Sequence, residues 1–445
     1  MKLSKFNYFT KNEKNELLLF NTLEGTKSLL KIPAYYAESV EGVLSGKSLP
    51  NTLDNTILEK LVRLNYIISN DVDEEAIVYQ LYLKNVCDSA LELTIIPTEK
   101  CNFRCKYCYE SFPDNIMSKE IQNAIVKYIK KNIHKYSSLH VSWFGGEPLL
   151  AIDIIESLSE EFKKVCAYYK KPYTASITTN GYMLNVVNFK RLLKCNVLYY
   201  QVTVDGLRDT HDSQRPHVDL KVSTYDQIIN NFLSIKQHIR SNVFRITVRS
   251  NFSKPMIHRI AEYKETFYSL FKDDKRFQFF IRPVMDWGGE TIESFRSNLI
   301  ESKYMDELYS EIISNNNELP FIYGDFMSPG CGACEAGKMN YYIITTDGNI
   351  YKCTCDFAKY PEAKIGELDT NGNMILNNTK ASQWLCNFKT CTNDCFYSPI
   401  CFKDACPSRR IFDNKTTDRC PIEKRNLSQI LCILDKDSNL FQSLL

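Results

Sequence analysis

LELTIIPTEKCNFRCKYC, residues 91–108, joins an apolar segment to three closely spaced cysteines. The first eight residues are mostly apolar and rich in Ile and Thr, which predicts a buried strand. Cys101, Cys105 and Cys108 follow directly in one loop. Three thiolates this close can ligate three irons of a [4Fe–4S] cluster and leave the fourth iron open. Structural zinc sites usually use four ligands in two separated pairs. The spacing therefore favours an open iron–sulfur cluster.

The pattern that begins at residue 91 repeats along the chain. Apolar strand candidates start near residues 91, 139, 174, 199, 243 and 277. Amphipathic helical stretches lie between them, for example at 118–135, 152–170, 185–194, 224–240 and 254–271. Six strands that alternate with helices predict an α/β fold with a parallel sheet. Such a sheet places its chemistry in the loops after the carboxyl ends of the strands.

Composition narrows the class of protein. The chain has 445 residues, of which 44% are hydrophobic, enough for about three domains. No apolar run approaches the roughly 20 residues that a membrane helix needs, and the first residues lack a secretory signal. We therefore expect a cytoplasmic protein with no membrane partner. A net charge of +2 gives no global attraction to nucleic acid.

The cysteine content is abnormal for such a chain. Seventeen cysteines without an export signal favour metal ligation over disulfides, because the cytosol keeps thiols reduced. Four of them are scattered through apolar or helical stretches and are interpreted as small buried hydrophobes: Cys87, Cys166, Cys195 and Cys432. Ten lie between Cys331 and Cys420.

This distribution divides the chain into three predicted domains. Residues 1–88 contain short strand-like runs and two helical patterns that resemble a winged-helix unit, and 73–87 predict a helical connection. Residues 89–323 hold the repeating strands and helices. Residues 324–445 are rich in Cys, Asn and Asp, and we expect them to need metal to fold.

The cysteine loop resembles that of the radical S-adenosylmethionine (SAM) enzymes, whose signature is CxxxCxxC with an aromatic residue, here Tyr107, before the last cysteine. The resemblance implies a partial parallel βα barrel of six strands. It also implies that the open iron binds SAM and that one electron releases a 5′-deoxyadenosyl radical, which abstracts a hydrogen atom from the substrate. The protein's part is to orient the cofactor and exclude solvent.

Three further segments match this family in order at successive strand ends. They are Gly145-Gly146-Glu147-Pro148, Thr178-Thr179-Asn180-Gly181, and Val204-Asp205-Gly206 followed by His211-Asp212 and Arg215. Arg249 and Asn251 on the fifth strand resemble polar cofactor contacts. The resemblance therefore implies that SAM is bound by Tyr107, Gly145, Gly146, Glu147, Pro148, Thr178, Asn180, Asp205, Arg249 and Asn251.

The cysteine-rich region resembles the SPASM pattern, which in that family builds two auxiliary [4Fe–4S] clusters. Cys334, Gly348 and Cys353 match its opening, with an Asp347-Gly348 hairpin turn between the cysteines. The later spacings depart from the family by one residue each. The resemblance implies an outer cluster on Cys391, Cys395, Cys401 and Cys420, and an inner one on Cys334, Cys353 and Cys406. Cys331 is the first candidate for the fourth inner ligand, with Cys355 and Cys386 as alternatives. A zinc-ribbon-like region stays open, because thiol spacing does not fix the metal.

The first domain shows no clustered basic residues, so a DNA-binding role is not supported. Its pattern resembles the peptide-recognition element of ribosomal-peptide maturases, in which a leader peptide adds a strand to a sheet edge. A passive extension is the alternative interpretation.

Together these features predict a peptide maturase with three [4Fe–4S] clusters and SAM, supplied with electrons by a flavodoxin or ferredoxin. It would abstract hydrogen from a ribosomally made precursor peptide and install a thioether or carbon–carbon crosslink. One alternative is a maturase that oxidises an active-site Cys or Ser of another enzyme, as sulfatase maturases do. The other is a non-catalytic metal-binding peptide adaptor. Asp356 and Asp404 are candidate general bases.

Overall fold

The structure is a computed structural model in which the placement of most of the chain is described. The exceptions are Leu220, Glu290, Asp306, Leu445 and the ranges 302–303, 309–310, 312–326, 358–359, 386–394, 414–419 and 437–439. Cys391, predicted as an outer-cluster ligand, and Cys386, an alternative inner ligand, therefore lie outside the described residues.

The central element is a ten-stranded sheet in the order β11-β10-β9-β8-β7-β6-β12-β13-β14-β15. Six of its strands are those predicted from the sequence, and each pairs in parallel with its neighbour. Their bounds are β6 Leu91–Thr98, β7 Leu139–Gly145, β8 Tyr173–Thr179, β9 Val197–Thr203, β10 Arg245–Phe252 and β11 Phe277–Pro283. The predicted α/β fold with a parallel sheet is confirmed.

The helices between these strands also follow the sequence pattern, except α7, which it did not predict. They are α4 Lys119–Asn132, α5 Ile152–Tyr168, α6 Val186–Lys194, α7 Arg208–Gln214, α8 Thr224–His238 and α9 Ile260–Phe271. Ser118, Asn185 and Ser223 cap α4, α6 and α8, because each side chain accepts a hydrogen bond from a backbone N–H of the first turn. The predicted helix at 254–271 begins instead as a 3₁₀ turn over Lys254–Arg259.

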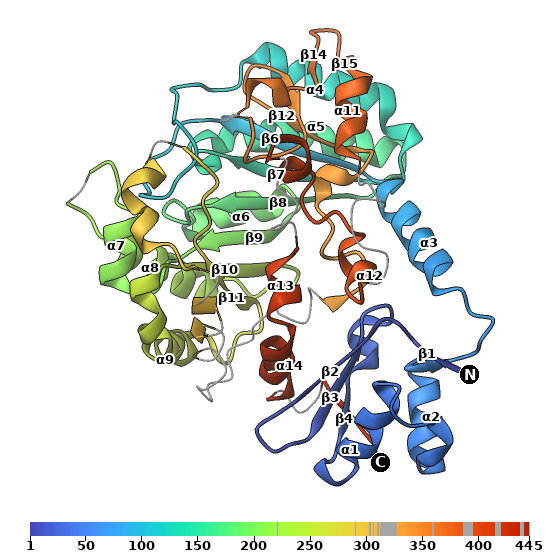
Figure 1. Ribbon diagram of the computed structural model, residues 1–445. Coiled ribbons are helices and arrows are strands. Elements are labelled where there is room, and N and C mark those ends of the chain that lie inside the picture. The colour runs from blue at the N-terminus through green and yellow to red at the C-terminus, as the bar shows by residue number, and fades with distance from the viewer. Residues whose placement is uncertain are drawn as a thin grey trace.

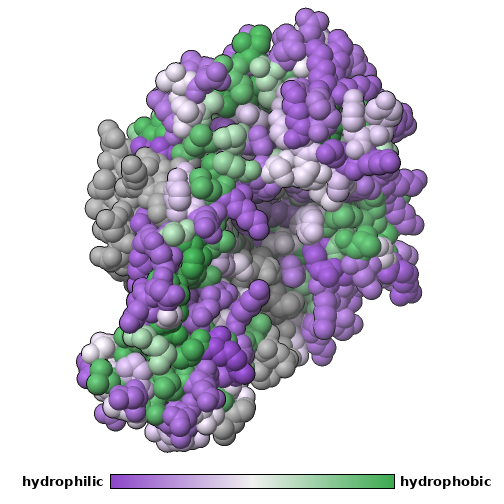
Figure 2. All heavy atoms as spheres, turned by 90° about the vertical axis from the view of Figure 1, so that its right-hand side faces the viewer, coloured by the Kyte–Doolittle hydropathy of each residue, from purple (hydrophilic) through white to green (hydrophobic). Residues whose placement is uncertain are grey.

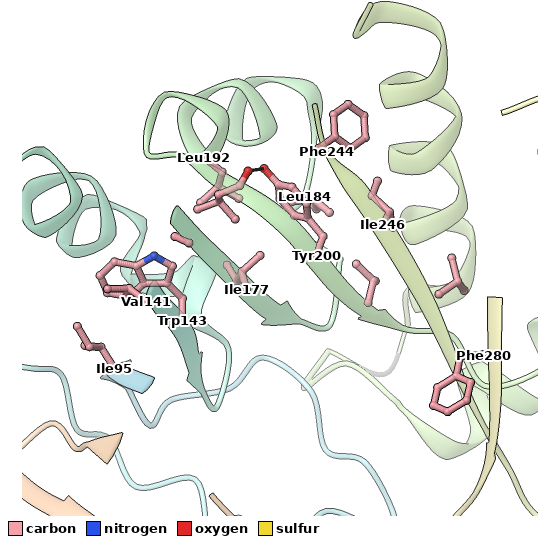
Figure 3. Packing of buried hydrophobic residues seen from close by; sticks show 14 of the residues in the cluster. Ile95, Val141, Trp143, Ile177, Leu184, Leu192, Tyr200, Phe244, Ile246 and Phe280 are labelled. Carbon is pink, nitrogen blue, oxygen red and sulfur yellow. Dashed lines mark hydrogen bonds between the residues drawn. The ribbon is translucent and has the colours of Figure 1, made fainter. Parts of the chain in front are cut away.

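The two faces of this sheet differ in character. Along β7 and β8, buried residues alternate with half-exposed ones. The buried side chains, including Val141, Trp143 and Ile177, pack against the helices (Figure 3). The other face carries polar groups such as His140, which hydrogen-bonds Thr174 at 2.9 Å across the strands. One face therefore forms the core, and the other is left for polar chemistry.

The first part of the chain folds around a separate core. β2 Asn7–Lys11, β3 Leu17–Asn21 and β4 Leu30–Ile32 form an antiparallel sheet, followed by α1 Ala34–Leu44 and α2 Asn55–Arg63. The short strands β1 Lys2–Leu3 and β5 Ile67–Ile68 pair with each other. The helix α3 Glu74–Val86, predicted as a connection, leads to the central sheet (Figure 1). Figure 2 shows the first unit as a lobe that projects from the larger body.

The cysteine-rich region extends the central sheet, which the sequence did not predict. β12 Tyr341–Ile344 pairs in parallel with β6, and the predicted hairpin turn leads to β13 Asn349–Tyr351, with Gly348 at φ +83°. The remaining elements are β14 Gly366–Leu368, β15 Met374–Leu376, α11 Asn378–Trp384, α12 Ser398–Cys401, α13 Ile422–Arg425, α14 Leu427–Asp435 and β16 Gln442–Ser443. In the part of the chain that is described, no helix combines the length and the apolar character that crossing a bilayer requires.

Candidate functional site

The three cysteines of the loop after β6 lie together at the carboxyl end of the parallel sheet. Cys105 is buried, and Cys101 and Cys108 are half-buried. Burial, with the nearby Glu147 carboxylate as a second cause, raises the pKa of Cys101 to about 12, and burial also raises the pKa of Cys105 and Cys108. Such thiols stay protonated by themselves, whereas bound iron would displace their protons. Three neighbouring thiols with little solvent access fit the open cluster that their spacing predicts.

The two glycines at the end of β7, Gly145 and Gly146, bring the strand against the start of this loop. A Cβ on Gly146 would lie 2.3 Å from the carbonyl oxygen of Lys100, closer than any real contact. The Glu147 N–H donates to that same carbonyl at 2.8 Å. The Gly-Gly pair therefore allows β7 to hold the segment just before Cys101.

Glu147 connects the ends of the second and third predicted strands. Its side chain is fully buried and accepts hydrogen bonds from the Thr179 hydroxyl at 2.7 Å, the Asn180 N–H at 2.7 Å and the Leu149 N–H at 3.0 Å. Pro148 opens the 3₁₀ turn that follows. In this structure Glu147 acts as a positioning residue within the predicted SAM site.

Asn180 extends the same network to the cysteine loop. Its Nδ2 donates to Oδ1 of Asn102 at 2.7 Å, one residue after Cys101. The neighbouring Thr178 lies half-buried in β8. The third strand end is thereby fixed against the cysteine loop, as the order of the motifs predicted.

A buried polar network joins Tyr107 to the fourth and fifth strands. The Tyr107 hydroxyl donates to Oδ2 of Asp205 and accepts from Arg215 at 2.9 Å and from Asn251 at 3.3 Å. Oδ1 of Asp205 accepts from the Asn251 backbone N–H at 2.9 Å. Burial raises the pKa of Asp205, an effect that the Arg215 guanidinium opposes. Four residues from three of the predicted motifs thus meet in one cluster.

Arg249 lies beside this network on β10. Its Nε donates to Oδ1 of Asn251 at 3.0 Å. Burial and the neighbouring Arg282 guanidinium lower the pKa of Arg249. Arg282 at the end of β11 forms an ion pair with Glu423 of α13, so the cysteine-rich region reaches this end of the sheet. Guanidinium groups here suit a ligand that carries a carboxylate.

Sequence reasoning missed two features that touch the cysteine loop. Gly289, at φ +89°, follows the sixth strand and packs so tightly that a Cβ would lie 2.8 Å from Cα of Tyr109. The Thr291 hydroxyl donates to the carbonyl oxygen of Cys108 at 2.5 Å. The Gly288-Gly289 pair was a signal for this close approach.

Glu110 is another residue beside the cysteine loop that the sequence reasoning missed. It lines a hollow of about 220 Å³ together with Glu99 and Asp347. Burial, and then the neighbouring Glu99 and Glu147 carboxylates, raise the pKa of Glu110 to about 7. Its place two residues after Cys108 was the available signal. The predicted candidate general bases, Asp356 and Asp404, are buried in the cysteine-rich region instead, and Asp404 forms an ion pair with Arg410 at 3.0 Å.

The described cysteines of the tail form two neighbourhoods. In the inner one, Cys353 and Cys355 are neighbours, Cys334 lies near Cys353, and Cys406 lies near Cys355. Tyr109 of the first loop also lies near Cys355. The structure therefore places Cys355 near a predicted inner ligand, and the identity of the fourth ligand stays open.

The outer neighbourhood contains Cys395, Cys401 and Cys420. Lys424 lies near Cys395 and 3.6 Å from the Cys420 sulfur. Cys331, the first candidate for the inner site, lies near Tyr397 and Cys401 instead. Among the described side chains, no three of His, Cys, Asp and Glu converge as one metal ion would require.

Comparison with known proteins agrees with this geometry. Residues 95–263 match the family model described as the Radical SAM superfamily, whose members bind a [4Fe–4S] cluster and SAM. The chain is 34% identical over 121 residues to a GTP 3′,8-cyclase of Aliarcobacter butzleri, covering 26% of this chain and 34% of that protein. It is 26% identical over 224 residues to the radical SAM cyclopropyl synthase TigE of Paramaledivibacter caminithermalis, covering 44% and 47%.

These curated relatives are matched over part of their length only, since the chain spans 34% and 47% of the two. Among solved structures, anSMEcpe with bound SAM and the Cp18Cys peptide superposes with a TM-score of 0.57 at 19% identity, covering 78% of this chain and 97% of that one. At this identity the similarity shows a shared fold. The chain therefore carries a radical SAM domain over residues 95–263.

Proposed function

We propose that this enzyme is a peptide maturase that abstracts a hydrogen atom from a ribosomally made precursor and installs a thioether or carbon–carbon crosslink. The observation that carries the proposal is the contact between the two cysteine regions. Tyr109, next to Cys108, lies near Cys353 and Cys355 of the inner tail group. A second redox centre would thus adjoin the first.

This adjacency suits a crosslinking reaction. A crosslinked peptide has lost two hydrogen atoms, so an electron must leave after the first hydrogen is abstracted. The cluster and SAM, when bound, supply the adenosyl radical chemistry. The chain's own residues hold the loop, orient the cofactor and exclude water, through the networks around Glu147 and Tyr107. Cys334, Cys353, Cys355 and Cys406 are the side chains that would hold the inner cluster.

A peptide substrate is supported by two further considerations. The fold is shared with anSMEcpe, a protein whose structure contains a bound peptide. The first unit offers a small antiparallel sheet, a surface on which an extended peptide can add a strand. We therefore assign residues 1–88 to leader recognition, 89–323 to radical chemistry and 324–445 to two auxiliary clusters. We propose that the enzyme acts in the cytoplasm with a flavodoxin or ferredoxin as electron donor.

The test begins with anaerobic reconstitution of the full chain. With dithionite and SAM, the wild-type protein should form 5′-deoxyadenosine, and a variant with Ala at Cys101, Cys105 and Cys108 should form none. Cys166→Ala, which changes a thiol in the buried face of α5, is the matched control. A short peptide encoded beside the gene should then lose the mass of two hydrogens per crosslink. Cleavage of SAM without any modified peptide would reject the maturase assignment, and conversion of a Cys or Ser in a folded enzyme would favour the alternative.

A further inference from the structure

The small sheet of the first unit contains a strand from the other end of the printed sequence. Its order is β16-β4-β3-β2, and β16 pairs in parallel with β4, with Gln442 opposite Leu30 and Ser443 opposite Lys31. Figure 1 shows the red end of the chain beside the blue first unit. One edge of the sheet proposed to bind a leader is therefore already covered.

The occupying segment, residues 440–444, is held by backbone and side-chain contacts. The Gln442 N–H donates to the Leu29 carbonyl at 3.0 Å, and its side-chain Nε2 donates to the Lys27 carbonyl at 2.7 Å. Leu444 is 6% exposed and packs in the core of the first unit, whereas Phe441 is 9% exposed and packs in the main core. Ser443 is exposed. The two buried apolar side chains of the segment, Phe441 and Leu444, thus lie three positions apart, and two polar residues lie between them.

The opposite edge of the sheet is tied to the rest of the protein in a different way. On β2, the Tyr8 ring stacks on Phe396 with centroids 5.0 Å apart, and its hydroxyl lies 2.7 Å from Oγ of Ser428. Asn12 donates to Asp435 at 2.8 Å. The outer edge of β4, by contrast, is covered by β16, which pairs with it through two residues, Gln442 and Ser443. A strand held by so few pairs is the one that another strand can most easily replace.

We propose that residues 440–444 occupy the docking edge of β4 in place of the substrate, and that the precursor's leader displaces them. This inference rests on the proposed function. The partner it predicts is an extended peptide with two apolar side chains at the spacing of Phe441 and Leu444, separated by uncharged polar residues. Because both strands need the same N–H and C=O groups of β4, binding of one excludes the other. The segment therefore lowers the enzyme's affinity for weak or incorrect peptides.

The test uses the chain's own segment as the probe, so it does not depend on catalysis. A fluorescein-labelled synthetic peptide of residues 436–445 is titrated with the reconstituted full-length protein by fluorescence anisotropy. Gln442→Pro removes the N–H that donates to Leu29, and Leu444→Ala removes the apolar anchor. We expect the double variant to bind the probe at least about tenfold more tightly than wild type, because the competing segment no longer holds the edge.

Two controls make the result specific. Ser443→Pro introduces proline one position further along, where strand alternation turns the N–H away from β4. The protein with this substitution should bind the probe as wild type does. A probe with Ala at both Phe441 and Leu444 should not bind. An iron content equal to that of wild type shows that each variant is folded. If the double variant is not folded, the single variant Gln442→Pro is used in its place. Equal affinity of wild type and variant for the probe would overturn the proposal, as would binding of the Ala-substituted probe.

A final measurement connects the edge to the substrate. When a modified precursor is identified, hydrogen exchange at the Gln442 amide should accelerate on its addition, while Leu30–Ile32 stays protected. Unchanged protection of Gln442 with the precursor bound would show that the leader binds elsewhere, which overturns the inference. It would leave the proposed chemistry standing, because that is judged by 5′-deoxyadenosine and crosslinked product.

Discussion

The Tyr107 hydroxyl donates a hydrogen bond to the Asp205 carboxylate across 98 residues of sequence. One partner belongs to the cysteine loop, and the other follows the fourth predicted strand. Arg215 and Asn251 bind the same hydroxyl, so the loop is fixed to three later segments through one side chain. The aromatic residue of the cysteine motif thus has a structural task besides any contact with a cofactor.

Removing this hydroxyl should weaken the cofactor site. Tyr107→Phe removes the hydroxyl that bonds Oδ2 of Asp205 and the Arg215 guanidinium, at a cost of about 1–3 kcal/mol. We expect affinity for SAM to fall about tenfold or more while iron content stays near wild type. Isothermal titration of the reconstituted protein with SAM measures the first quantity. Tyr200→Phe, which loses a buried hydroxyl elsewhere in the sheet, should leave SAM affinity unchanged. Wild-type affinity in Tyr107→Phe would show that the network does not shape the site.

The close approach at Gly146 predicts a strong effect from one methyl group. Gly146→Ala would place Cβ 2.3 Å from the Lys100 carbonyl and 2.4 Å from that of Glu99, so the segment before Cys101 must move. We expect cluster loading on the three-cysteine loop to fall severalfold, as measured by iron content and electron paramagnetic resonance. Gly42→Ala, in helix α1, meets only the Ser48 side chain, and its iron content should match wild type. Full loading of Gly146→Ala would contradict the proposed packing role.

The third prediction concerns metal content. Three [4Fe–4S] clusters would bring about twelve irons to each chain, and the triple Ala variant at Cys101, Cys105 and Cys108 should keep about eight. Elemental analysis after anaerobic reconstitution gives both values. Iron near four with stoichiometric zinc would instead assign the cysteine-rich region to zinc and remove the auxiliary clusters from the mechanism.

The pH dependence of stability should carry a contribution from His211. Its Nδ1 accepts the Asp205 backbone N–H at 3.0 Å, and burial, with Arg215 as a second cause, holds the pKa of His211 well below its ordinary value. Below about pH 6.5 the unfolded chain therefore binds a proton that the folded one does not, and stability falls as pH falls. Urea unfolding should show a shallower acid dependence for His211→Asn, which keeps an acceptor. An identical slope in both proteins would show that His211 is protonated in the folded state.

The sequence predicted the parallel sheet well because its information is local. Strands such as β6 and β7 combine an apolar pattern with a following motif, and each motif lies at a strand end, where a parallel sheet brings such ends together. The gathering of Tyr107, Asp205 and Asn251 follows from that geometry. Their individual partners do not, because they depend on side-chain directions that a pattern of residues does not encode.

Other features could not be predicted because they are pairings between distant segments. β12 continues the central sheet beside β6, and β16 joins the sheet of the first unit. Strands of two to four residues carry little pattern of their own, so their partners are decided by tertiary packing. The fourth inner ligand is a similar case. The sequence made Cys331 the first candidate and Cys355 an alternative, whereas the structure places the two in different neighbourhoods.

The last prediction tests the role of the inner cysteine group. If it accepts the electron left after hydrogen abstraction, Cys334→Ala with Cys353→Ala should uncouple the reaction. Cleavage of SAM should continue and crosslinked peptide should disappear, because no acceptor removes the electron from the radical left on the peptide. Deuterium transfer from labelled peptide into 5′-deoxyadenosine would show that abstraction still occurs. Cys87→Ala with Cys432→Ala, at the end of α3 and within α14, is the matched control and should behave as wild type. The variant must retain about four irons on the first loop to be informative. If it does and still forms product at the wild-type rate, the inner group is structural, and the electron leaves by another route.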